Sequence, residues 1–264
     1  WLPDAHPAAP SSISAMLSGV VIKAGIYAII RVLFLSYYGS VVFDYARNVL
    51  LVLGLLTVTI PNIIALVQDD IKRLLAYSSI YNMGLIFIAF AIGTEFGVLA
   101  AIFHILTHAI AKALLFLGAG AFIESAETRS IEELRGIGKS MGITGKMFLV
   151  GNLSIAGLPP FIGFFSKVMI IVAVILAGMN GNLIYMGVAI VIVLNTTLSL
   201  GYYWGKLTRG LIVTSETREA KEAKASMIIG QGILVATIII LTLLIPILIP
   251  FLADIISLSL PPYA

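Results

Sequence analysis

The sequence predicts an all-α polytopic membrane protein, a bundle of about seven transmembrane helices with one broken helix. Three observations predict this class. The 264 residues are 60% hydrophobic and 11% charged, with a mean hydropathy of +1.09, whereas soluble chains carry about 25% charged residues. Apolar runs of about 20 residues, the length that crosses a bilayer, alternate with short polar breaks. One of these runs contains Gly157-Leu158-Pro159-Pro160.

The apolar runs place seven spans along the chain. We expect them to form a single transmembrane domain over residues 1–264, in which the first segment, 1–11, lies on the cytoplasmic side. The spans lie near residues 12–36, 48–67, 74–93, 97–122, 147–176, 183–205 and 228–253. The chain opens on Trp1 rather than methionine, and we expect it to be part of a longer protein.

Basic residues are distributed unevenly between the two sides of this arrangement. The side shared by the N-terminal segment carries Lys72, Arg73, Arg129, Arg135, Lys139, Lys146, Lys206, Arg209, Arg218, Lys221 and Lys224. The other side carries Arg47, with Arg31 near the boundary. Basic residues accumulate in cytoplasmic loops. We therefore expect a cytoplasmic N-terminal end and an outward C-terminal Pro-Pro-Tyr-Ala, in the plasma membrane of a prokaryote.

The fifth span contains consecutive prolines about a third of the way along. They remove two amide donors and clash with the preceding turn. Non-helical backbone at membrane depth persists only where it is buried in protein or lines a wet cavity. The sequence therefore predicts a helix break at Gly157, Pro159 and Pro160. Pro61, alone in the second span, is expected only to kink its helix.

Three lysines lie inside apolar runs, and none of the 13 acidic residues does. They are Lys23, Lys112 and Lys167. A charge at the bilayer centre costs about 2.5–3.5 kcal/mol on insertion scales, so such lysines indicate an ion or proton pathway. Lys23 lies roughly 16 Å into its span, too deep for easy snorkelling to the interface. Lys167 follows the prolines by two helical turns.

His104, His108 and Lys112 recur at i, i+4 and i+8 in the fourth span, so they form one polar stripe on a helix. Imidazole titrates near neutrality and either ring nitrogen can pass a proton, so the stripe indicates a proton relay. Alternatively, either histidine alone could make an interhelical hydrogen bond. The His-xxx-His spacing also suits zinc, but no third ligand is evident. We expect no metal and no catalytic residue in this chain.

Composition excludes several function classes. The chain has no cysteine, which excludes disulfides, thiolate metal sites and cysteine-ligated iron–sulfur clusters. Any redox chemistry and its cofactors are therefore expected in other subunits. The net charge of +3 is spread over loops rather than gathered into an arm, so no nucleic-acid partner is expected.

The sequence resembles the antiporter-like membrane subunits shared by complex I, Mrp cation/proton antiporters and membrane-bound hydrogenases. The resemblance covers nearly the whole chain, in order. Its motifs are Trp1-Leu2-Pro3-Asp4-Ala5-His6, Ser18-Gly19-Val20-Val21-Ile22-Lys23, Asp70-Ile71-Lys72-Arg73-Leu74-Leu75-Ala76-Tyr77-Ser78-Ser79, His104-xxx-His108-xxx-Lys112-Ala113-Leu114-Leu115-Phe116 and Gly157-Leu158-Pro159-Pro160-xx-Gly163-Phe164-xx-Lys167.

The resemblance implies a fold of about fourteen helices in two inverted repeats, each with one broken helix, of which this chain is the second half. It implies that Lys23 links two half-channels, that His104 and His108 relay protons, and that Lys167 lies at the outward exit. Some relatives have glutamate on this broken helix, so Lys167 groups the chain with lysine-type members. An acidic residue and a further lysine would lie upstream.

We therefore expect a proton- or sodium-translocating subunit of a membrane respiratory complex, of hydrogenase or complex I type. It would conduct through buried lysine, histidine and water. One alternative is a subunit of an Mrp-type cation/proton antiporter, and another is a structural subunit that conducts nothing. The expected partners are the lipid bilayer and other membrane subunits, including an upstream half or neighbour that supplies an acidic residue.

Overall fold

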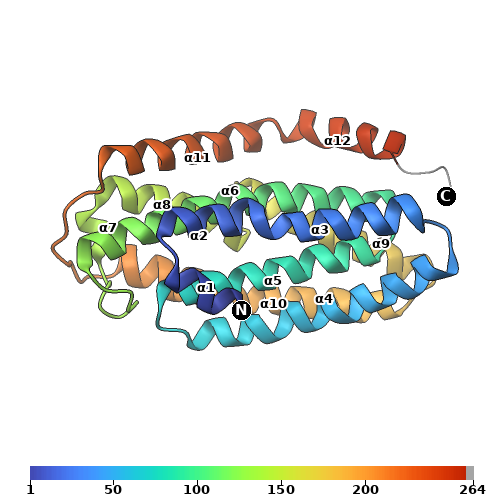
Figure 1. The fold of residues 1–264 in the computed structure, drawn as a ribbon, viewed down its shortest axis with the longest axis horizontal. Coiled ribbons are helices and arrows are strands. Elements are labelled where there is room, and N and C mark those ends of the chain that lie inside the picture. Colours follow the sequence, from blue (N-terminus) through green and yellow to red (C-terminus); the bar gives the residue numbers. More distant parts are fainter. Residues whose placement is uncertain (260–264) are drawn as a thin grey trace.

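The computed structural model describes residues 1–259, which form a bundle of long helices lying side by side (Figure 1). The first span is a continuous run of α- and π-helical segments. The elements are α1 (Leu2–Ala8), α2 (Ser11–Met16), η1 (Leu17–Val21), α3 (Ile22–Ile30), η2 (Arg31–Ser36), α4 (Val41–Val67), α5 (Ile71–Ala91), α6 (Glu95–Ala126), α7 (Ile137–Ser140), α8 (Gly142–Ala156), α9 (Ile162–Met179), α10 (Ile184–Leu200), η3 (Gly201–Val213), α11 (Ala225–Leu243) and α12 (Ile245–Ser259).

Seven stretches of the described chain are long and apolar enough to cross a membrane. This number and the all-helical architecture confirm the predicted class, a polytopic membrane helix bundle. The stretches are Ser11–Phe34, Val41–Val67, Ile71–Ala91, Glu95–Ala126, Ile162–Met179, Ile184–Val213 and Ala225–Leu243.

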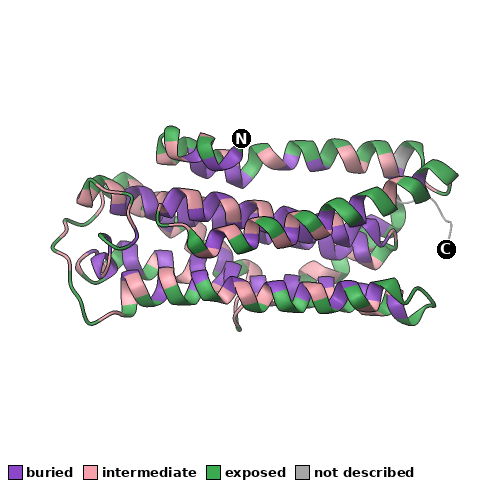
Figure 2. Cartoon of the chain, turned by 90° about the horizontal axis from the view of Figure 1, so that it is seen from below, coloured by how far each residue is buried: buried purple, intermediate pink, exposed green. Residues whose placement is uncertain are grey.

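The helices α5 and α6 form the centre of the bundle. In their most apolar stretches 83% and 67% of the residues are buried, against 28% in the first span and 11% in α11. Figure 2 shows the same contrast, with exposed residues along the outer helices and buried ones inside. Side chains that lie on α5 and α6 are therefore shielded by protein rather than by lipid.

Side chains of the preceding residues cap the two central helices. The Asp70 carboxylate accepts hydrogen bonds from the backbone amides of Lys72 and Arg73, at 2.8 and 3.1 Å, and so begins α5. The hydroxyl of Thr94 accepts from the amide of Gly97 at 3.2 Å and begins α6. Such caps satisfy amides that have no partner within the helix.

The predicted break is present between α8 and α9. The first half-helix ends at Ala156, and Gly157 has a φ of 85°, a left-handed conformation that favours glycine. The bond between Pro159 and Pro160 is cis. The second half-helix begins at Ile162. The structure thus confirms one broken helix, at the position that the prolines predict.

A second interruption lies near the C-terminus and was not predicted. The sequence indicates one span over 228–253, but α11 ends at Leu243 and α12 begins at Ile245. Pro246 explains the change, because its ring excludes the carbonyl four residues before it and it has no amide hydrogen to donate. Pro250 lies further along inside α12.

Connections rich in basic residues lie together at one end of the bundle, here called the basic end. Segments 68–70, 127–136 and 214–224 meet there, at the left of Figure 1. The amide of Ile71 donates to the carbonyl of Arg129 at 3.0 Å. The connections at the opposite end are 37–40, 92–94 and 180–183. The outward position expected for Ala264 lies outside the described residues.

Candidate functional site

All five predicted pathway residues are buried in the bundle. The exposed fraction is 9% for Lys23, 4% for Lys167 and 0% for His104, His108 and Lys112. They come from three elements, α3, α6 and α9. Of these, α6 and α9 pack against α5. Their partners therefore have to be found on neighbouring helices.

Lys112 is held by the first turns of α5. Its Nζ donates to the carbonyl of Leu75 at 3.0 Å and to the hydroxyl of Ser78. It also lies 5.6 Å from the ring centre of Tyr203 on η3, within the range of a cation–π contact. A carbonyl, a hydroxyl and an aromatic face thus surround the ammonium group.

Asn82 connects this cluster to His104. Its Nδ2 donates to the carbonyl of Ser78 at 2.6 Å, so the amide oxygen points the other way, toward Nε2 of His104 at 3.2 Å. Because an amide oxygen only accepts, Nε2 of His104 carries a hydrogen. Asn82 therefore fixes which nitrogen of His104 remains to exchange a proton, namely Nδ1.

Nδ1 of His104 faces the hydroxyl of Ser166 on the broken helix at 2.9 Å. The same hydroxyl can also donate to the carbonyl of Gly163 at 3.0 Å. A hydroxyl has one hydrogen and rotates to suit its partners. When His104 is neutral, Ser166 donates to Nδ1; when it is protonated, Nδ1 donates to Ser166, which turns to Gly163. The geometry accommodates both protonation states.

Lys167 lies next to Ser166 and reaches back across the break. Its Nζ donates to the carbonyl of Ala156, the last residue of α8, at 3.1 Å. The carbonyl end of a helix carries about half a negative charge, which favours a cation there. Nζ also lies 5.5 Å from the ring centre of Tyr81. The break thus supplies a partner that an unbroken helix would not offer.

Close approach of the two half-helices requires glycine. A Cβ on Gly163 would lie 1.7 Å from the carbonyl oxygen of Ser154, and one on Gly157 would lie 2.9 Å from Cδ of Lys167. The amide of Ile162 donates to the hydroxyl of Thr242 on α11 at 3.1 Å, which caps the second half-helix from outside. The position of Lys167 therefore depends on three elements.

Lys23 lies to one side of this row and joins it through serines. Its Nζ donates to the carbonyl of Ser18 in the π-helical turn η1. The hydroxyls of Ser18 and Ser79 lie 2.9 Å apart, and Ser79 also donates to the carbonyl of Leu75 at 2.9 Å. That carbonyl is the one that accepts from Lys112. π-Helical turns are frequent at functional sites.

His108 lies between His104 and Lys112 on α6, and neither of its ring nitrogens has a hydrogen-bond partner within residues 1–259. The described residues therefore provide no hydrogen-bonded connection through His108, and its part in a relay stays a prediction. The described residues contain no group of three histidine, cysteine, aspartate or glutamate side chains that could hold a metal ion.

The three lysines form no ion pair with a carboxylate among the described residues. The ion pairs in the part of the chain that the structure describes lie near the two ends of the bundle, and none includes Lys23, Lys112 or Lys167. The row consists of cationic and neutral groups from α3, α5, α6 and α9. Such a row suits the transfer of protons or the passage of a cation, and no bond-making chemistry is evident in it.

Comparison with known proteins identifies the family. The model described as "NADH:quinone oxidoreductase/Mrp antiporter, TM" matches residues 1–193. The chain belongs to this family. Hydrogenase-4 component B of Escherichia coli is 38% identical over 178 residues, 63% of this chain and 26% of that protein. NADH-quinone oxidoreductase subunit M of Rickettsia felis is 37% identical over 167 residues, 63% of this chain and 34% of that protein.

Solved structures share the fold over almost the whole chain. An archaeal membrane-bound sulfane sulfur reductase superposes with a TM-score of 0.85 at 31% identity, covering 97% of this chain and 51% of that one. Complex I from Thermus thermophilus gives 0.74 at 28%, covering 95% and 53%. An Mrp complex from Dietzia sp. gives 0.80 at 24%, covering 97% and 55%. The chain thus spans about half of these structures, and less of the curated relatives it matches.

Several members of the row in this antiporter-family chain were missed by sequence reasoning. They are Ser18, Ser78, Ser79, Asn82 and Ser166. The spacing of Ser78 and Asn82, at i and i+4 in an apolar span, is a pattern that indicates a polar helix face. Nothing in the sequence indicates that Ser18 and Ser79 meet, because they are far apart along the chain.

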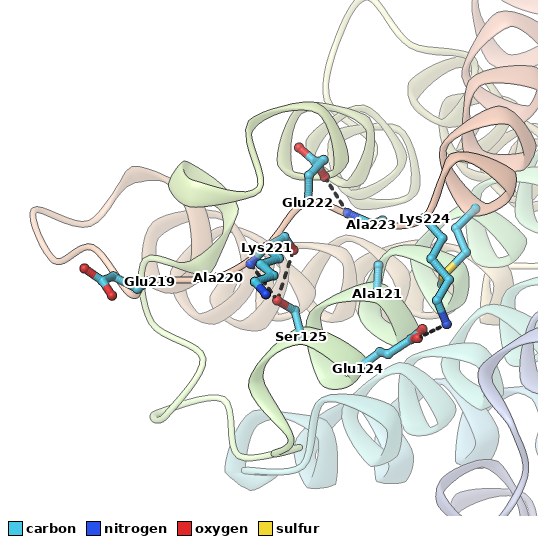
Figure 3. Close-up of a pocket in the computed structure, with 10 residues that line it drawn as sticks. Ala121, Glu124, Ser125, Glu219, Ala220, Lys221, Glu222, Ala223 and Lys224 are labelled. Atoms are coloured by element: carbon cyan, nitrogen blue, oxygen red, sulfur yellow. Dashed lines mark hydrogen bonds and ion pairs between the residues drawn. The ribbon is translucent and has the colours of Figure 1, made fainter.

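A pocket of about 720 Å³ lies apart from this row, at the basic end (Figure 3). It lies between the end of α6 and the segment that leads to α11. Lys224 pairs with Glu124 at 2.5 Å, and the amide of Lys221 donates to Ser125 at 3.0 Å. None of the predicted pathway residues lines it. These contacts hold the entry to α11 against α6.

Proposed function

We propose that this chain is a proton- or sodium-translocating antiporter-like subunit of a membrane respiratory complex, of hydrogenase or complex I type. The observation that supports it best is the buried row itself. Lys112, Ser78, Asn82, His104 and Ser166 follow one another at hydrogen-bonding distance through the centre of the bundle. Intramembrane lysines that face protein mark ion pathways in general.

In this proposal each member of the row has a separate task. Lys112 and Lys167 hold and release protons, and His104 passes a proton while Ser166 rotates with it. Asn82 does not carry a proton and positions His104. Lys23 exchanges with the row through the serines and so serves a side branch. Water completes the path where side chains do not touch, including at His108.

The proposal includes an orientation and partners. The basic end faces the cytoplasm of a prokaryote, because basic residues accumulate on that side, and the plasma membrane is the location. Other membrane subunits surround the chain, and one of them supplies a carboxylate. The chain has no native cysteine, so a single cysteine at Arg218 tests the orientation. Its labelling from outside intact cells would contradict the proposal.

The decisive experiment measures ion transport by the intact complex reconstituted in liposomes. Lys167→Ala should reduce transport by about tenfold or more, because hydrogen bonds to charged groups contribute about 1.5–3 kcal/mol. Lys167→Arg should restore little of the transport, since a guanidinium group does not release a proton at pH values near neutrality. Lys146→Ala, which removes an exposed lysine of α8, is the matched control.

The outcomes separate the candidate functions. Transport at the parental rate by Lys167→Ala would remove that lysine from the mechanism. If transport depends on Lys167 but the chain copurifies only with small membrane subunits, the result selects the Mrp-type alternative over the respiratory one. Normal electron transfer without any ion movement in the parent complex would leave only the structural alternative.

A further inference from the structure

The N-terminal helix α1 closes the basic end of the row. Figure 1 shows it folded back against the start of α5. Three cations hold it there. Arg73 pairs with Asp4 at 2.8 Å, Lys72 donates to the carbonyl of Ala9 at 2.7 Å, and a third bond joins Arg129 to Pro7 at 3.1 Å. The segment is therefore fixed relative to the lysine row.

His6 is the buried polar side chain of α1. Its exposed fraction is 0%, and neither ring nitrogen has a hydrogen-bond partner within the described residues. The ring stacks on Phe116 of α6, with centres 4.4 Å apart and an angle of 17° between planes. Only its backbone is bonded, the carbonyl accepting from the hydroxyl of Ser14 at 3.0 Å.

Phe116 is the next position on the stripe of His104, His108 and Lys112, four residues further along α6. One helical turn, about 6 Å along the axis, therefore separates Lys112 from the residue on which His6 stacks. His6 thus occupies the place where the polar stripe would continue toward the basic end. It extends the row with an ionisable group from a different element.

A purely packing role does not explain a histidine here. Phenylalanine would stack on Phe116 equally well, whereas a buried polar group without a partner destabilises the fold. Burial, with the nearby charges of Lys112 and Lys72, lowers the pKa of His6 to about 4. The ring is therefore neutral at physiological pH, with one nitrogen able to accept a proton and the other able to donate one.

We propose that His6 is a further pathway residue, through which protons pass between the aqueous phase at the basic end and Lys112. This inference rests on the proposed function. A proton from water binds one ring nitrogen of His6, and the hydrogen on the other nitrogen leaves through bridging water to the uncharged amine of Lys112. The amine becomes ammonium, and the ring returns to its first tautomer before the next transfer.

The charged groups around His6 favour passage over storage. Lys72 from α5, and Lys112 from α6 once it has become an ammonium, both disfavour a lasting imidazolium. The carboxylate of Asp4, on the same helix, is paired with Arg73. Arg129, from the segment after α6, is paired with Asp70 of the turn before α5 at 3.3 Å. A ring that is neutral between transfers suits these surroundings, because it takes up one proton and releases another in the same passage.

The test uses the intact complex in liposomes, with transport measured against the pH on the basic side. His6→Phe keeps the stacking on Phe116 and should reduce transport about tenfold. It should also remove the response of the rate to pH on that side, which a structural role would not do. His6→Ala with imidazole added to the buffer should regain part of the lost rate, whereas Lys167→Ala with imidazole should not.

The result distinguishes this inference from the proposed function. If Lys167→Ala abolishes transport but His6→Phe transports at the parental rate with the parental pH response, the role of His6 is wrong and the proposed function stands. If Lys167→Ala has no effect, the proposed function fails first. If His6→Phe does not assemble, His6→Ala decides, and the absence of any rescue by imidazole would then overturn the inference.

Discussion

Each buried lysine donates a hydrogen bond to a main-chain carbonyl. The acceptors are Ser18 for Lys23, Leu75 for Lys112 and Ala156 for Lys167. A carboxylate would favour the charged lysine strongly, whereas a carbonyl accepts from an ammonium and from a neutral amine alike. Carbonyl partners therefore suit lysines whose charge changes during turnover. One of the three carbonyls belongs to the π-helical turn η1, and another to the last residue of α8, just before the break.

Ser166→Ala tests the role of the hydroxyl beside His104. The variant removes the partner of Nδ1, and a hydrogen bond contributes about 0.5–1.5 kcal/mol, so transport should fall about 2- to 10-fold. Assembly should be unchanged, because the side chain is small. Thr197→Val is the control, since its exposed hydroxyl donates within α10, to the carbonyl of Val193 at 3.0 Å. Equal rates for both variants would exclude Ser166 from the relay.

At the scale of elements, the broken helix places a lysine where an intact helix could not. In an unbroken α-helix Lys167 would lie about 16 Å along the axis from Ala156, beyond the reach of its side chain, so Lys167 would lose that acceptor. The break also leaves amides at the start of α9, and Thr242 of α11 accepts one of them. Irregular backbone at this depth is satisfied by side chains from the same bundle.

Replacing Pro159 and Pro160 together with alanine tests this role. The substitution allows the two half-helices to join, which returns the carbonyl of Ala156 to the helix. We expect the transport rate to fall severalfold, with a much smaller effect on stability and with the complex still assembled. Transport is measured in liposomes and stability as the thermal midpoint of the purified complex. Normal transport by the double variant would show that the break has no part in conduction.

The docking of α1 should depend on pH through His6. Its pKa is lowered from 6.5 to about 4 by burial first and then by Lys112 and Lys72. Above pH 6.5 the ring is neutral whether α1 is docked or free, so docking does not change. As the pH falls from 6.5 toward 4, only the free form takes up the proton, and docking weakens.

Amide hydrogen exchange of residues 2–16, corrected for the intrinsic effect of pH, measures this docking. Protection should fall between pH 7 and pH 5 in the parent chain. His6→Phe should abolish the change, because the ring it introduces has no titrating group. A pH dependence that is the same in both proteins would assign the effect to other groups and contradict the prediction.

At the scale of the whole molecule, the sequence predicts those features of the fold that depend on a local pattern of residues. Hydrophobic runs and consecutive prolines indicate the bundle and its break, and the costs of burying Lys23 and Lys167 indicate where a pathway lies. The meeting of Ser18 with Ser79 and the folding of α1 under α6 depend on tertiary packing, which no local spacing encodes.

The outer faces of the bundle also bear on its assembly. In the first span Val20 and Val21 are 67% and 47% exposed, close in sequence to the buried Lys23. The exposed side chains of α4 and α11 extend this apolar surface around the molecule. Lipid or neighbouring membrane subunits cover such surfaces. Lys23 therefore belongs to a span whose most apolar stretch is only 28% buried.

Three charged lysines without a carboxylate would together cost about 8–10 kcal/mol on insertion scales, against ordinary stabilities of about 5–15 kcal/mol. Carbonyls, water and loss of a proton offset part of this, and a carboxylate from a neighbouring helix offsets the rest. We predict that an upstream half or adjacent subunit places a glutamate or aspartate near the exposed side of the first span, facing Lys23. A structure of the intact assembly decides it. The prediction fails if no carboxylate from any chain lies within about 10 Å, the Debye length at 0.1 M salt, of Lys23, Lys112 or Lys167.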